Sequence, residues 1–146
     1  MSGRGKDRAG GAKLRGKRAT YWLALVVGLC IAPFCAAEPR TLVLHGPVTN
    51  TTEDDATANV SMTLTVDGEK VTGEMRTEPP LVGTGKLEGR MVGAWCEVGG
   101  EMAEGYRIQF RGVVNGKDFR GTYVAAVPGE PVQYGKFQLR VRAAVK

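Results

Sequence analysis

The sequence predicts an all-β protein, a single small antiparallel meander barrel of about 6 to 8 strands, with a β-sandwich as the alternative. Three observations predict this class. From residue 59 onward apolar and polar residues alternate with a period of two, and Asp-Gly and Asn-Gly pairs separate the alternating segments. No window of helical length repeats apolar residues at spacings of three and four, and frequent glycines disfavour a helix interior.

Residues 1–37 are predicted to form a signal peptide. Residues 1–20 are a basic region with seven Lys and Arg side chains and one acid, and residues 21–34 are an uncharged apolar core. This core is shorter than the roughly 20 residues that a helix needs to span a bilayer, which is typical of a signal sequence. The segment therefore predicts export to the periplasm or the extracellular space.

Cleavage is expected after Ala37, because Cys35-Ala36-Ala37 places small residues before Glu38. The alternatives are an uncleaved signal anchor formed by residues 21–37 and a lipoprotein signal. All three export residue 38 onward, and we expect membrane contact only through this segment if it stays uncleaved.

The targeting segment also dominates the charge of the chain. The whole chain has a net charge of +5, whereas residues 38–146 carry 13 basic and 14 acidic residues. The basic pI therefore says nothing about the folded part, and we expect no nucleic-acid partner.

Residues 38–58 are predicted to be a linker, or a first short strand plus a long loop. A short apolar run over 41–45 precedes a polar stretch, 46–58, that contains Pro47 and three consecutive acids, Glu53-Asp54-Asp55. The barrel domain is then expected over residues 59–146.

Within that domain the sequence predicts two hairpins and a last strand. Asp67-Gly68 joins the first pair of alternating segments, and Asn115-Gly116 joins 106–114 to 117–125. The last strand is expected over 133–141. The segment 91–98 has apolar residues on both faces when it is counted as one strand, and Gly83-Thr84-Gly85 and Gly99-Gly100 are interpreted as turns.

An internal repeat of an apolar residue, x, Gly, x and a large apolar residue recurs along the domain. Gly73, Gly89, Gly105 and Gly121 fall 16 residues apart, although Gly105 lacks the full pattern. We expect Gly73, Gly89 and Gly121 to be structural glycines on the inward face, where a strand bends or an aromatic ring lies across them.

From residue 59 to 141 this pattern resembles the up-and-down barrels of the avidin and lipocalin type, which implies a small closed barrel. Avidin-type sites use several tryptophans, and this domain has only Trp95. Lipocalins open with a Gly-x-Trp strand, and none occurs near residue 40. No ligand-binding residue is therefore carried over from either family.

Five aromatic residues are candidates for lining a ligand cavity: Trp95, Phe110, Phe119, Tyr123 and Phe137. In a domain of this size we expect them to fill the core instead.

The other residues that could take part in catalysis or metal binding are expected to have structural or solvent-exposed roles. His45 is the sole histidine, which excludes metal sites with two or three histidines within one chain, and we expect it on the surface near a strand end. Cys96 is expected to be a buried, inert thiol, with pairing to another chain as the alternative. The acids at 53–55 are expected to form a solvated loop. No metal and no cofactor is predicted.

These features predict an exported, non-enzymatic β domain that binds a small molecule, a glycan or a protein, or that serves as an envelope accessory protein. A first alternative is a small exported hydrolase or isomerase that uses carboxylates such as Glu97 and Glu101. A second is a protein–protein interaction module that uses the two-sided apolar segment 91–98.

Overall fold

The computed structural model describes residues 38–79 and 81–145. The predicted signal peptide and its cleavage site lie outside the described residues. The described part forms eight strands: β1 (Arg40–Asn50), β2 (Ala56–Asp67), β3 (Lys70–Thr77), β4 (Thr84–Val92), β5 (Trp95–Glu101), β6 (Arg107–Val114), β7 (Asp118–Ala126) and β8 (Gln133–Val145). It includes no helix with the length and hydropathy needed to cross a lipid bilayer.

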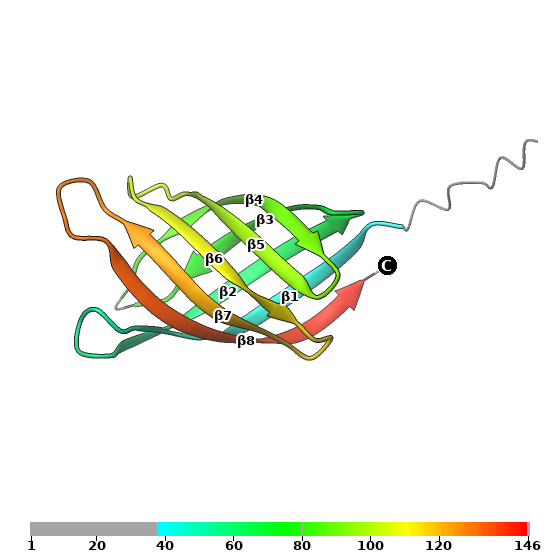
Figure 1. Ribbon diagram of the computed structural model, residues 1–146, viewed down its shortest axis with the longest axis horizontal. Coiled ribbons are helices and arrows are strands. Elements are labelled where there is room, and N and C mark those ends of the chain that lie inside the picture. Colours follow the sequence, from blue (N-terminus) through cyan, green and yellow to red (C-terminus); the bar gives the residue numbers. More distant parts are fainter. Residues whose placement is uncertain (1–37, 80, 146) are drawn as a thin grey trace, which may run out of the picture. The chain divides into compact units, whose positions relative to one another are not determined.

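The strands form one closed antiparallel barrel in which each strand pairs with the next (Figure 1). The closing contact is between β1 and β8, which pair from Thr41 opposite Val145 to Asn50 opposite Gly135. The meander barrel predicted from the sequence is confirmed. The sandwich alternative is wrong, because the closing contact leaves one continuous sheet without edges.

The connections at the two ends of the barrel differ in length. At the short-turn end, two or three residues join the strands: 68–69, 93–94 and 115–117. At the long-loop end, five or six residues do so: 51–55, 78–83, 102–106 and 127–132. Figure 1 shows the 51–55 and 127–132 loops together at the left, and the start of β1 and the end of β8 together at the right.

The barrel interior is filled by side chains that alternate with outward polar ones along every strand, as a pleated sheet requires. Four aromatic rings form a column along one side. The ring of Phe119 lies 4.7 Å from that of Phe137, Phe137 lies 5.3 Å from Phe110, and Phe110 lies 5.8 Å from Tyr123. The column runs from the short-turn end, at Phe119, to the long-loop end, at Tyr123.

The loop predicted over 46–58 is wrong, because β1 continues through Gly46-Pro47 to Asn50 and β2 begins at Ala56. Pro47 is tolerated because the β1–β8 ladder is interrupted there: pairing ends at His45 and resumes at Val48. On its other side Pro47 stays in register opposite Asn59 of β2. Only residues 51–55 form the connection.

The single strand inferred from the pattern of 91–98 is also wrong, because a two-residue turn at Gly93-Ala94 divides it between β4 and β5. Gly93 has a φ of 60°, which suits glycine in such a turn. Val92 pairs with Trp95 across the turn, so both side chains point outward, whereas Met91 and Cys96 point inward.

Gly99-Gly100 lies inside β5, and Gly85 lies inside β4, so the turns predicted at these glycines are wrong, apart from Gly83, which lies in the connection before β4. A Cβ atom at Gly100 would collide with the carbonyl of Lys86 on the neighbouring strand. The structural glycines Gly73, Gly89 and Gly121 have the same kind of surroundings, since a Cβ there would collide with a carbonyl of the adjacent strand. These glycines allow neighbouring strands to approach closely.

Candidate functional site

The long-loop end of the barrel contains a cavity of about 220 Å³. Residues of the connections and of the adjoining strand ends line it, and Phe110 is part of the lining. Its apolar lining is Val48, Val60, Leu81, Val82, Ile108, Phe110, Ala125 and Val127, and its polar lining is Glu53, Thr77, Tyr106, Tyr123 and Gln133. A mainly apolar hollow with a few polar groups is the usual form of a small-molecule site.

One rim of the cavity is held by a hydrogen-bonded chain of side chains. The Nδ2 of Asn50, which is 2% exposed, donates to Oε1 of Gln133 at 3.0 Å. The Nε2 of Gln133 then donates to Oε1 of Glu53 at 3.1 Å. The loop is further fixed to β8, because Thr51 N donates to the carbonyl of Tyr134 at 2.8 Å. These bonds hold the Glu53 carboxylate at the mouth.

The opposite rim is the 78–83 connection, which Thr77 and Tyr106 hold in place. Thr77 donates to the carbonyl of Gly83 through its N at 2.8 Å and through its Oγ1 at 3.2 Å. Tyr106 donates through its hydroxyl to the carbonyl of Val82 at 3.4 Å, and a Cβ atom at Gly83 would collide with that hydroxyl. Burial raises the pKa of Tyr106, the charge of Glu104 raises it further, and a hydrogen bond with Thr77 lowers it.

Tyr123 forms a wall of the cavity, and its ring lies across Gly135, where a side chain would collide with it. The residue is only 4% exposed. Burial raises the pKa of Tyr123, and neighbouring Tyr106 and Glu53 raise it further, so the phenol stays neutral and retains its proton. Among the described residues every fully enclosed side-chain nitrogen or oxygen has a hydrogen-bond partner. The Tyr123 hydroxyl has no such partner among them, so it is not fully enclosed and opens onto the cavity.

The five aromatic candidates divide into three groups. Phe110 and Tyr123 line the cavity. Phe119 and Phe137 fill the core toward the short-turn end, as expected for core residues. Trp95 is 48% exposed on the outer face, so its assignment to a cavity or core is wrong; the parity of the side chains reverses across the two-residue turn before it.

Sequence reasoning did not identify the rest of the lining. The lengths of the connections would have identified these lining residues, because alternate connections of a meander lie at the same end of the barrel. Inward residues next to the longer connections, such as Val48, Val60 and Ala125, must therefore surround one mouth.

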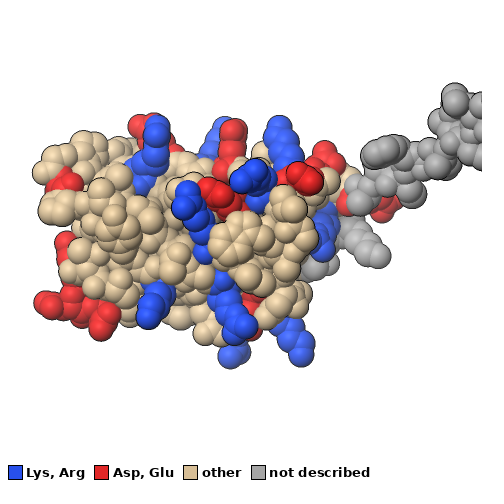
Figure 2. Space-filling view, in the orientation of Figure 1, with Lys and Arg blue, Asp and Glu red and all other residues tan. Residues whose placement is uncertain are grey.

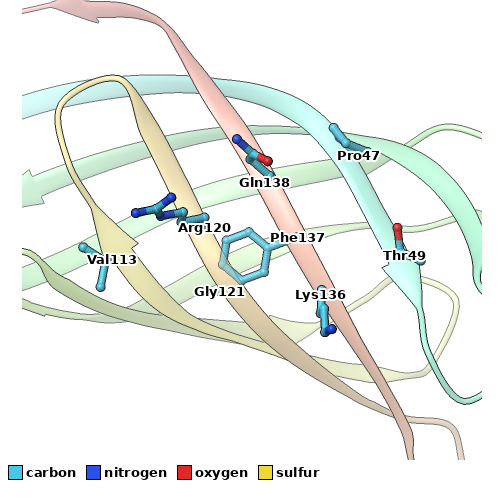
Figure 3. Close-up of a pocket in the computed structure, with 8 residues that line it drawn as sticks. All are labelled: Pro47, Thr49, Val113, Arg120, Gly121, Lys136, Phe137 and Gln138. Atoms are coloured by element: carbon cyan, nitrogen blue, oxygen red, sulfur yellow. The ribbon is translucent and has the colours of Figure 1, made fainter.

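A second hollow lies on the outer wall of the barrel (Figure 3). Four neighbouring strands contribute to its lining: β1 with Pro47, β8 with Gln138, β7 with Gly121 and β6 with Val113. Its volume is about 570 Å³, but it is shallow and open to solvent. Figure 3 shows Arg120, Lys136 and Gln138 pointing in different directions rather than toward one point. We therefore take the inner cavity as the candidate site, because its polar groups converge.

The other candidate residues lie apart from the cavity. Cys96 is buried, as predicted, and burial raises the pKa of its thiol to about 11. His45 lies within β1 rather than near a strand end, and its Nδ1 is 3.0 Å from Ser61 Oγ. Within residues 38–79 and 81–145 no three His, Cys, Asp or Glu side chains gather as metal ligands.

The carboxylates of the hydrolase hypothesis lie on the outer face of β5. Glu97 accepts a 2.6 Å hydrogen bond from Gln109 Nε2 and forms a 3.2 Å ion pair with Arg111. Glu101 is exposed at the end of the strand, and neither residue lines the cavity. The two acids do not face each other across a pocket, so this arrangement does not support the hydrolase hypothesis.

Comparison of the chain with protein-family models, curated proteins and solved structures gave no match. Its function therefore has to be inferred from the site itself.

Proposed function

We propose that this chain is an exported, non-enzymatic binding domain that holds one small molecule in the cavity at the long-loop end. The observation that carries this proposal is the convergence of an apolar hollow with the hydroxyl of Tyr123 and the carboxylate of Glu53. An apolar body would pack on Phe110, and a polar group would bond at the mouth.

The contrast within the barrel supports this function. Small eight-stranded barrels either fill their interior or hold one small ligand. Here the short-turn half is densely filled, with Phe119 and Leu139 completely buried, whereas the other half retains the cavity. Because an empty apolar space costs stability, a hollow confined to the looped end favours a ligand site over a packing defect.

A matched pair of substitutions tests the function. Ala125 is 6% exposed and faces the cavity, whereas Ala126 is the next residue and points outward. Ala125→Leu would fill the hollow, and Ala126→Leu would leave it unchanged. A fragment library of one-ring molecules, screened by NMR on the full chain, should give ligands that bind the wild type and Ala126→Leu but not Ala125→Leu. No ligand for the wild type, or equal binding to all three, would refute the proposal.

Export rests on the basic and apolar segments of residues 1–37. Mass spectrometry of the secreted protein should find a mature chain that begins at Glu38. A chain that stays in the cytoplasm with an intact N-terminus would contradict export.

A second candidate function, contact with a protein, is favoured by three adjacent apolar side chains on the outer face. Val92 pairs with Trp95, and Trp95 pairs with Val113; they are 50%, 48% and 39% exposed. Size-exclusion chromatography with light scattering tests self-association through this face. A dimer that becomes a monomer in Trp95→Thr would support it, and a wild-type monomer would exclude a second copy as the partner.

A further inference from the structure

The charged residues of the cavity lining and of the connections around it have one sign. Glu53 is charged, and no Lys, Arg or His lines the hollow. The four connections of the long-loop end, 51–55, 78–83, 102–106 and 127–132, contain six acids and no base: Glu53, Asp54, Asp55, Glu78, Glu104 and Glu130. Figure 2 shows only acidic side chains among the charged groups at the left edge of the molecule, where these loops lie.

This charge acts on whatever enters the cavity. Several like charges around the mouth of a low-dielectric hollow raise the local concentration of cations and repel anions. The single ion pair found among the described residues joins Arg111 to Glu97 on the outer wall, so it does not neutralise Glu53. The carboxylate is oriented at the mouth by the amide of Gln133.

The interior adds groups that suit a cation. Tyr123 is 4% exposed as a residue, and its hydroxyl has no hydrogen-bond partner among the described residues, so its oxygen can accept a hydrogen bond from an N–H group in the cavity. Phe110 and Tyr123 both line the cavity, and aromatic rings attract a positive charge placed over their faces. An ammonium placed between Glu53 and Tyr123 would stay near solvent, which avoids the cost of burying a charge deeply.

The size of the cavity limits the ligand further. A volume of about 220 Å³ lies below the roughly 300–1,000 Å³ of pockets that hold drug-sized ligands. One ring with a short side chain fits this space, whereas a long acyl chain or an oligosaccharide does not.

We propose that the ligand is a small organic cation: a primary amine on a compact apolar body, with its nitrogen at Glu53 and Tyr123 and its body on Phe110. This inference rests on the proposed binding function and specifies the chemical class of the ligand.

The test uses three probes that share a phenyl ring and differ in charge: 2-phenylethylamine, 2-phenylethanol and phenylacetate. Binding to the full chain is measured by NMR titration. The amine should bind about tenfold more tightly than the alcohol, because an ion pair and a cation–π contact are added, and phenylacetate should bind most weakly. The preference for the amine should decrease when salt is raised from about 20 mM to about 500 mM.

Substitution of Glu53 tests whether its carboxylate is the source of the preference for the amine. Glu53→Gln should remove most of the preference for the amine, because the ion pair is lost and only the cation–π contact remains, without changing the affinity of the alcohol. Glu130→Gln, which removes a charge from a loop residue outside the cavity lining, should change the preference by less than about twofold. Equal binding of amine and alcohol to the wild type, or a preference that Glu53→Gln leaves unchanged, would overturn the cation inference and leave the binding function intact. If Ala125→Leu blocks no probe, the binding function itself fails.

Discussion

The two ends of the barrel are built from the same eight strands, yet their interiors differ. At the short-turn end Phe119, Leu139 and Cys96 are completely buried in a continuous core. At the long-loop end Ala125 and the valines Val48 and Val60 leave a hollow of about 220 Å³. Strand pairing therefore closes the barrel in the same way at both ends, and the size of the inward side chains decides which end has room for a ligand.

The connections of the two ends differ in charge as well. The long loops carry only acids, whereas the short turns 68–69, 93–94 and 115–117 carry one acid, Glu69, and one base, Lys117. Since residues 38–146 are nearly neutral in total, this difference is one of distribution, which composition does not reveal. Stability measurements on the two ends provide direct tests of the contrast.

The largest expected effect is the loss of a buried ring at the filled end. Phe119→Ala removes a side chain that packs edge-to-face on Phe137 and should lower the free energy of unfolding by about 3–5 kcal/mol. Urea unfolding measures this change. A loss below about 1 kcal/mol would mean that the short-turn end is as loosely packed as the cavity end.

Enlarging a small side chain should have different effects at the two ends. Cys96→Leu adds two heavy atoms to a filled region and should destabilise the protein by about 1–3 kcal/mol. Ala125→Leu enters the hollow and should change stability by less than about 1 kcal/mol. Thermal unfolding of both variants measures the difference, and equal losses would contradict the contrast.

The smallest effect is expected from alkaline pH at the filled end. Burial raises the pKa of Cys96 from 9.0 to about 11, so the folded state favours the neutral thiol. The resulting stabilisation is complete below pH 9.0 and is lost as the pH rises through about 11. Because tyrosines titrate in the same range, the measurement is the difference between wild type and Cys96→Ala in urea unfolding. That difference should shrink above pH 9.0, and a constant difference would contradict burial of the thiol.

The fold could be predicted because the alternation of apolar and polar residues reports which face of a strand is inward. The turns at Asp67-Gly68 and Asn115-Gly116 also follow local chemistry, and Gly68 and Gly116 have positive φ values of 59° and 87°. β1 could not be predicted in full, because the tolerance of Pro47 depends on an interruption in the ladder with β8, which is distant in sequence.

The candidate site could be predicted only in part. Phe110 and Tyr123 were identified as aromatic candidates, but a sequence does not reveal whether an inward ring meets another side chain or an empty space. Trp95 was misplaced because a two-residue turn reverses the parity of inward and outward positions. The polar lining residues Glu53 and Gln133 come together from the 51–55 loop and the start of β8, although they are 80 residues apart in sequence.

The pairing of Thr41 with Val145 brings the first and last strands of the barrel to the same end, opposite the cavity mouth. A fusion partner, a tether or an immobilising tag joined at either position would therefore point away from the ligand entrance. The same proximity permits a circular permutation, in which a short linker joins the two positions and new ends open within the 127–132 loop. The barrel is thus a scaffold that can be attached at one end while its opposite end stays accessible to small molecules.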